Sequence, residues 1–412
     1  MDFDAIPQPA VEHLAQVQGA ELLIGVLGAN GTSSAVASMV RQALEGFPHP
    51  PRAVLVVDKG AAEPRLENEQ PLAVLFCRLS DATSSAASPQ GFFSAYHTIF
   101  GIGRGIGARA CTVIASQLQT VTPLWITQLV RPALDMEFDL VTPRYARHKW
   151  EGLINRSVLS PLSRALYGKR IQNPMGPDLG LSARMMQPLI EDQAKARGAS
   201  RGNPLASVLA TAVRCNFQIC EAQVGARLQP PLDWMNLSSL LAQILGPVFL
   251  DVEQNAAVWQ RVRGSHAVPG FGPAETAPEE GGPVDAGRLI ESFHLGAKNL
   301  QDVWSLVLPP TVLLEIRKLS RLPLEQFRML DEVWVSIVYD FALAHRVRTI
   351  NRDHLLRSFT PLYLGWIASY AQEMGSAGPF EVEARLERLA QAYEAGKPYL
   401  VSRWRWPDRF NP

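Results

Sequence analysis

The stretch Glu21-Leu22-Leu23-Ile24-Gly25-Val26-Leu27-Gly28-Ala29-Asn30-Gly31-Thr32 joins a short apolar run to a glycine-containing loop. A helix from about residue 33 to residue 44 is predicted to follow, with Thr32 or Ser33 as its cap. A short, continuously apolar run of this kind is typical of a strand that is buried on both faces. The stretch therefore predicts the first strand, loop and helix of an α/β protein, in which ligands bind where strands end.

The same alternation continues through the first half of the chain. Further strands are predicted at 52–58, 72–77, 110–115 and 138–142, and helices at 92–106 and from Thr122-Pro123 onward, since proline is favourable in a first helical turn. Because these strands are apolar throughout, we expect a mostly parallel sheet between helix layers.

Strand signals stop after Val224, and helical periodicity follows. Helices are predicted at 236–260, 286–304, 310–321, 324–347, 352–372 and 380–397, with a Pro- and Gly-rich loop or hinge from Arg263 to Asp285. We therefore expect an α/β domain over residues 1–230 and a helical domain over residues 231–412.

Composition excludes several classes of function. Lys and Arg together number 39, as do Asp and Glu, so no basic field is available for nucleic acid or an anionic membrane. The chain starts Met1-Asp2-Phe3-Asp4, which is acidic where a secretory signal is basic, and no uncharged stretch resembles a membrane span. The four cysteines show no CxxC spacing. We expect a cytoplasmic protein, and the helical half offers apolar surface for a homodimer.

Glycine patterns leave the ligand class open. Gly28-Ala29-Asn30-Gly31 could hold a phosphate at a helix N-terminus, but it matches neither a dinucleotide-binding nor a P-loop pattern. The glycines from Gly101 to Gly107 come where a helix ends, which is the wrong context for such a motif.

The order of the segments along the chain resembles that of the GT-A glycosyltransferases. The resemblance is strongest to the bacterial glucosylglycerate, glucosyl-phosphoglycerate and mannosylglycerate synthases, and it spans about residues 20 to 400. It rests on the first strand and loop, Asp58 and the segments 96–100, 113–118, 122–126, 147–152, 161–168, 176–182, 338–342 and 358–365. It implies a GT-A fold with an all-α C-terminal region, and transfer of a hexose from a UDP- or GDP-sugar to a small acidic acceptor.

The chain departs from this family where the family binds its metal. The family's Asp-x-Asp pair, which holds Mg²⁺ or Mn²⁺ on the donor diphosphate, corresponds to Ala115-Ser116-Gln117, and Gln229 stands where a metal-binding His is expected. Pro89-Gln90-Gly91 replaces a Gly-Lys-Gly loop, and Gly202-Asn203-Pro204 replaces a Gly-Ile-Asp step. We therefore predict no metal ligands, with Mg²⁺ or Mn²⁺ as cofactor only if the protein is active, and whether it is an enzyme stays open.

The resemblance also implies which residues form the site. The nucleotide-sugar would contact Gly28, Ala29, Asn30, Asp58, Gln90, Ser116 and Gln117. Catalytic roles would fall to Asp178, His148 and Lys149, and the acceptor would contact Arg144, Arg147, Asn155 and Gln229.

Each assignment has a plainer alternative. Asp58 could merely cap a strand end, and Asp178 could merely form a turn. The basic cluster of Arg144, His148 and Lys149 could be a solvated loop. Tyr339, Asp340 and His345 share one predicted helix, and a buried polar contact to the α/β half is the plainer interpretation of them.

Three hypotheses follow for function. The first is a glycosyltransferase that moves a hexose from a nucleotide donor to a small acidic acceptor, either active or, as the lost carboxylates favour, degenerate and weakly active or inactive. The second is a non-catalytic binding or regulatory protein that partners an active paralogue. The third, a nucleotidyltransferase, would also need paired carboxylates.

Overall fold

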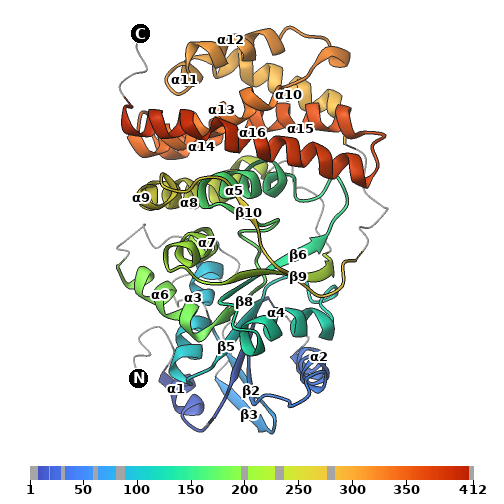
Figure 1. Cartoon of the computed structure of the whole chain (residues 1–412), viewed down its shortest axis with the longest axis vertical. Helices are drawn as coiled ribbons and strands as arrows, with labels where there is room; N and C mark the ends of the chain where they lie inside the picture. Colours follow the sequence, from blue (N-terminus) through green and yellow to red (C-terminus); the bar gives the residue numbers. More distant parts are fainter. Residues whose placement is uncertain are drawn as a thin grey trace. The chain divides into compact units, whose positions relative to one another are not determined.

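The chain forms two compact units in a computed structural model, which describes residues 8–17, 19–28, 33–58, 64–79, 89–195, 203–227, 236–275 and 284–407. Met1–Ala146, Ile171–Leu228 and Ala267–Ala277 make up the first, here called the α/β unit (Figure 1). Arg147–Arg170, Gln229–His266 and Pro278–Pro412 make up the second, the helical unit. This division differs from the predicted boundary between residues 230 and 231, because residues 147–170 group with the later helices and not with the sheet.

A nine-stranded sheet organises the α/β unit, with the strand order β11-β9-β6-β8-β5-β1-β2-β4-β3. Strands β3 and β8 run antiparallel to their neighbours, and the other pairings are parallel. The strands are β1 (Leu22–Val26), β2 (Ala53–Asp58), β3 (Arg65–Glu69), β4 (Leu72–Cys77), β5 (Ala110–Ile114), β6 (Leu140–Ala146), β8 (Leu179–Ser182), β9 (Ile219–Ala226) and β11 (Gly270–Phe271).

Helices cover both faces of the sheet. Leu22, Ile24 and Val26 of β1 join the core under α2 and α4, whereas Gly25 lies against Ile99 of α3. This alternation follows from the two-residue period of a strand, and the missing Cβ of Gly25 lets Ile99 approach. The helices are α1 (Gln8–Leu14), α2 (Ser33–Glu45), α3 (Pro89–Gly105), α4 (Pro123–Asp135), α6 (Ala183–Lys195) and α7 (Pro204–Arg214).

The predicted fold class is confirmed: the α/β unit has a mostly parallel sheet between helices, and a helical region follows it in the sequence. The predicted helix start at Thr122-Pro123 is also confirmed, since the Thr122 hydroxyl accepts a hydrogen bond from the Trp125 amide at 3.2 Å. Strands β3, β8, β9 and β11 were not predicted. Strand β3 is polar, β8 and β11 are short, and β11 also lies in the predicted loop.

The helical unit is built from helices of very different lengths. They are η1 (Asn155–Leu159), α5 (Ser160–Tyr167), α8 (Leu237–Gln254), α9 (Ala256–Trp259), α10 (Ala286–Asn299), α11 (Gln301–Ser305), α12 (Pro310–Leu319), η3 (Leu324–Gln326), α13 (Asp331–Val347), α14 (Arg352–Ser358), α15 (Thr360–Met374) and α16 (Pro379–Arg405). Two further short strands are β7 (Lys169–Arg170) and β10 (His266–Ala267). Among the residues that the structure describes, no helix is both long enough and apolar enough to cross a membrane.

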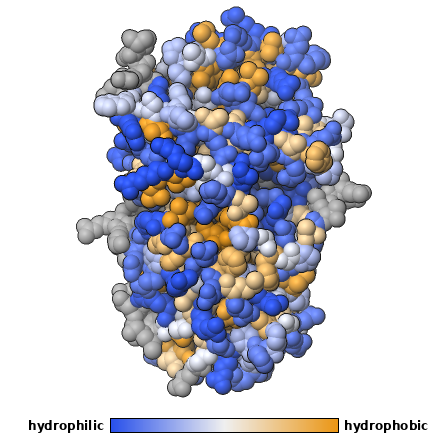
Figure 2. Space-filling view, in the orientation of Figure 1, coloured by the Kyte–Doolittle hydropathy of each residue, from blue (hydrophilic) through white to orange (hydrophobic). Residues whose placement is uncertain are grey.

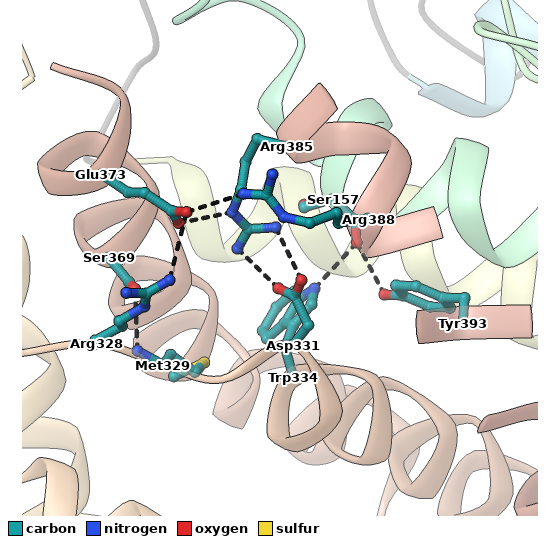
Figure 3. Close-up of polar contacts among 10 residues, drawn as sticks. All are labelled: Ser157, Arg328, Met329, Asp331, Trp334, Ser369, Glu373, Arg385, Arg388 and Tyr393. Carbon is teal, nitrogen blue, oxygen red and sulfur yellow. Dashed lines mark hydrogen bonds and ion pairs between the residues drawn. The ribbon is translucent and has the colours of Figure 1, made fainter. Parts of the chain in front are cut away.

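Polar contacts hold residues 147–170 in the helical unit. The Ser157 carbonyl accepts hydrogen bonds from Trp334 Nε1 at 3.0 Å and from the Tyr393 hydroxyl at 2.8 Å (Figure 3). Arg164 donates to Glu387 at 2.6 Å and to Glu394 at 2.9 Å. These contacts join η1 and α5 to α13 and α16, which lie more than 160 residues later.

A buried arginine joins three helices of the same unit. Arg385 of α16 donates two hydrogen bonds to Asp331 of α13, at 2.7 and 2.9 Å, and one to Glu373 of α15, at 2.6 Å (Figure 3). The Arg385 side chain is only 6% exposed, so this bidentate pairing compensates for the lost hydration of its guanidinium.

Hydrophilic residues cover much of the face shown in Figure 2, and many of the apolar residues on it gather toward the middle of the view. Exposed leucines of the helical unit include Leu295, Leu306 and Leu314. Single exposed apolar residues are normal on soluble proteins. The homodimer therefore stays a prediction.

Candidate functional site

The carboxyl ends of the parallel strands define the edge of the sheet where a ligand is expected. Gly28 follows β1, Asp58 ends β2 and Ser116 follows β5, so all three belong to this edge. Asp178 joins them because it precedes β8, and β8 runs antiparallel to β5.

Asp178 is the centre of a buried hydrogen-bond network at this edge. Its Oδ1 accepts hydrogen bonds from the backbone amides of Ala115 and Ser116, at 2.8 and 2.9 Å. Its Oδ2 accepts from the hydroxyls of Ser116 and Tyr145, the latter at 2.5 Å. The residue is 0% exposed. A carboxylate has about four lone-pair sites, and the protein's own donors occupy this number.

Two tyrosines surround this carboxylate. The Tyr96 hydroxyl donates to the Pro177 carbonyl at 2.5 Å, which fixes α3 against the residue before Asp178. Burial, with the nearby Asp178 and Tyr145, raises the pKa of Tyr96 well above its ordinary value, so it remains a donor. The Arg227 guanidinium lies over the Tyr145 ring at 5.4 Å from its centre. Sequence reasoning missed the roles of Tyr145 and Arg227, because neither belongs to a recognisable local pattern.

Hydrogen bonds to Asp178 therefore hold the loop after β5. Ser116 is buried with its amide and hydroxyl both engaged, whereas Gln117 is exposed. In the part of the chain that the structure describes, no three His, Cys, Asp or Glu side chains gather as metal ligands would.

A second buried acid lies on β9, which pairs with β6. Glu221 is 5% exposed, and its Oε1 accepts a hydrogen bond from the Gln172 amide at 2.6 Å. Burial raises the pKa of Glu221 to about 7, although the Gln172 amide and the charge of Arg144 act to lower it. Arg144 on β6 thus lies within electrostatic reach of Glu221. The sequence analysis did not single out Glu221, which reads as one polar residue in a mostly apolar run.

Asp58 makes the contact expected of a strand-end cap. Its Oδ1 accepts a hydrogen bond from the Leu79 amide at 3.3 Å, which ties the end of β2 to the residues after β4. The side chain is half-buried, so a role in nucleotide binding stays a prediction.

The remaining predicted nucleotide contacts are only partly described. Gly28 is exposed and has φ +70°, in the left-handed region that glycine tolerates. Gln90 lies in the first turn of α3. Ala29, Asn30 and Gln229 lie outside the described residues.

The predicted acceptor residues are divided between the two units, since Arg144 belongs to the α/β unit, whereas Arg147 and Asn155 belong to the helical unit. The predicted catalytic residues His148 and Lys149 also belong to the helical unit. Asn155 begins η1.

Lys149 and His148 both have partners inside the helical unit. The Lys149 ammonium donates to the carbonyls of Met374, Gly375 and Ala377, at 3.0, 2.7 and 3.1 Å. These contacts use the three protons of an ammonium and stabilise the C-terminal end of α15. Burial lowers the pKa of His148, and its Nδ1 accepts from the Trp150 amide at 3.4 Å. The catalytic roles of both residues stay predictions.

No family model matches the chain, and no curated protein matches it. Similar solved structures include those of glucosyl-3-phosphoglycerate synthase from Mycobacterium tuberculosis. The complex with Mn²⁺, UDP-glucose and phosphoglyceric acid is 14% identical, with a TM-score of 0.38 over 61% of this chain and 85% of that chain. The complex with Mg²⁺ and UDP is 15% identical, with a TM-score of 0.39 over 60% and 83%. The complex with phosphoglyceric acid is 15% identical, with a TM-score of 0.38 over 65% and 94%.

Removal of the Asp178 carboxylate is expected to destabilise the α/β unit. Asp178→Ala leaves two buried amides and two hydroxyls without their acceptor, so it should lower the free energy of unfolding by about 3 kcal/mol or more. Asp178→Asn keeps one carbonyl oxygen and should cost less. Urea unfolding measures both, with Asp58→Ala as a control that should cost under about 1 kcal/mol. An Asp178→Ala variant as stable as the parent would contradict a buried structural role.

The raised pKa of Glu221 makes stability depend on pH. The folded pKa of about 7 exceeds the ordinary 4.5, so folding takes up a proton between these values and stability falls as pH rises through this window. Glu221→Gln removes this contribution. The variant should therefore gain about 3 kcal/mol relative to the parent between pH 4.5 and pH 8.

Urea unfolding at both pH values provides the measurement. Asp340→Asn is a matched variant in the helical unit, since burial also raises the pKa of Asp340 to about 7. An unchanged difference between Glu221→Gln and the parent at the two pH values would refute a buried, protonatable Glu221.

Proposed function

We propose that this chain is a glycosyltransferase-like protein that binds a nucleotide-sugar, UDP- or GDP-hexose, at the carboxyl edge of its sheet without a carboxylate-held divalent cation. Such a protein would transfer the hexose to a small acidic acceptor weakly or not at all. The observation that carries the proposal is the position of Asp178, whose two oxygens are both engaged by the loop that follows β5 and by Tyr145.

Metal-assisted sugar transfer needs oxygen ligands at this point. A divalent cation neutralises the charge that develops on the departing diphosphate, and carboxylates hold it there. Ala115, Ser116 and Gln117 supply no carboxylate after β5. Asp178 does supply one, but its lone pairs face protein donors, so recruiting it as a ligand would break the hydrogen bonds that hold the loop.

Two arginines can supply positive charge in place of the cation. Arg144 lies near the end of β6, and Arg227 directly follows β9, the strand paired with it. Arg227 Nε is buried and makes no hydrogen bond among the described residues. Guanidinium groups suit phosphate oxygens because they donate in pairs and remain charged. We therefore assign the diphosphate to Arg144 and Arg227.

This proposal predicts nucleotide binding that is independent of metal. Calorimetric titration with UDP-glucose and with GDP-mannose should give, for the nucleotide that binds, the same Kd in Mn²⁺ and in EDTA, within about twofold. Arg227→Ala removes a charge-assisted contact of about 1.5–3 kcal/mol and should weaken that binding roughly tenfold or more. Arg65→Ala, on the exposed edge strand β3, should leave it unchanged.

Two results would count against the proposal. A Kd at least tenfold lower in Mn²⁺ than in EDTA would mean that carboxylates elsewhere in the chain hold a cation, as in a metal-dependent transferase. Absence of binding for both nucleotides would favour the non-catalytic scaffold.

A further inference from the structure

A cavity of about 530 Å³ lies within the helical unit, remote in sequence from every residue assigned above. We call it the α10–α12 pocket, because those helices and the turns beside them line it; the three helices can be followed in Figure 1. Its lining residues are His294, Ala297, Lys298, Gln301, Trp304, Leu313, Ile316, Arg317, Ser320 and Arg321.

Helical spacing explains how these residues come to share one cavity. His294, Ala297 and Lys298 follow the i, i+3, i+4 spacing that places side chains on one face of α10. Leu313, Ile316 and Arg317 repeat this spacing along α12, and Gln301 and Trp304 of α11 add to the lining. Two matched faces therefore contribute to the walls of the pocket.

The charge of the lining is of one sign. Lys298, Arg317 and Arg321 are cationic, and the lining includes no Asp or Glu. Three positive charges around one cavity repel one another, and nothing in the lining offsets them. A bound anion would remove this repulsion.

Arg317 and His294 present nitrogen atoms to the pocket. With the Gln301 amide turned so that its oxygen faces Arg317, that oxygen accepts from Arg317 Nε at 3.1 Å and restrains the guanidinium. Nε2 of His294 is buried and has no hydrogen-bond partner among the described residues. The His294 ring packs against the rings of Phe293 and Phe327, with ring centres at 6.0 and 6.3 Å.

The rest of the lining is apolar. Leu313 and Ile316 contribute aliphatic surface, and Trp304 is anchored because its Nε1 donates to the Ser358 carbonyl at 3.0 Å. A volume of about 530 Å³ lies in the range of small-molecule sites and is far larger than one phosphate ion requires. The site therefore has room for an organic group beside the anion.

We propose that the α10–α12 pocket binds a small organic phosphate, with the phosphate on Arg317, Arg321 and Lys298 and the organic portion against Leu313, Ile316 and Trp304. A phosphate is favoured over a carboxylate because its double charge and three terminal oxygens match several cationic donors. This site is separate in sequence from the proposed nucleotide-sugar site, and either can fail without the other.

Titration calorimetry with phenyl phosphate tests the proposal on the full chain. Phenyl phosphate should bind more tightly than inorganic phosphate, and phenol should not bind measurably, because both the anion and the ring contribute. The double variant Arg317→Ala/Arg321→Ala should weaken phenyl phosphate binding at least tenfold, and Lys298→Gln should also weaken it.

Lys318→Ala is the matched control, since Lys318 lies on the same helix, carries the same charge and is absent from the lining. It should bind phenyl phosphate as the parent does. Urea unfolding of each variant reports whether the fold is retained, and Lys298→Gln makes the smallest change to packing.

Three outcomes would overturn the proposal. One is an equal Kd for phenyl phosphate in the parent and in folded Lys298→Gln and Arg317→Ala/Arg321→Ala variants. Another is no binding at millimolar phenyl phosphate. The third is tighter binding of an acidic peptide such as hexaglutamate, which would make the pocket part of a protein-docking surface.

Discussion

The carboxylate of Asp178 satisfies two backbone amides and two hydroxyls at the point where β5 ends. A buried carboxylate is tolerated only where hydrogen-bond donors replace its hydration, and Asp178 has four such donors. The consequence reaches beyond Asp178 itself. The loop at residues 115–117, Tyr145 at the end of β6 and Tyr96 on α3 are all fixed around one side chain. The edge of the sheet that would receive a ligand is thus built on a buried negative charge directed toward the protein.

Much of the α/β unit can be predicted from the sequence, because its strands and helix starts are marked by short local patterns. Strands β1, β2, β4 and β5 are short apolar runs, and Thr122 with Pro123 marks the start of α4. Strand β8 is only four residues long, and β3 is polar and exposed, so neither produces such a signal.

The site is harder to predict because it depends on contacts between distant segments. The loss of carboxylates at Ala115-Ser116-Gln117 is visible in the sequence, but Asp178 contacts this loop from 62 residues away. Glu221 and Arg227 likewise gain their significance from the pairing of β9 with β6. The same limit applies to residues 147–170, whose partners Trp334, Glu387 and Tyr393 come from later helices.

The central claim is that Asp178 holds the loop after β5 through its hydrogen bonds, so that its carboxylate is not free to bind a divalent cation. Hydrogen–deuterium exchange at the amides of Ala115 and Ser116 tests it most directly, because those protons form the hydrogen bonds in question. The account predicts slow exchange that approaches the global unfolding limit, with the same rates in UDP-glucose whether Mn²⁺ or EDTA is present. Rapid exchange at both amides, or exchange that changes only when Mn²⁺ is added, would contradict it.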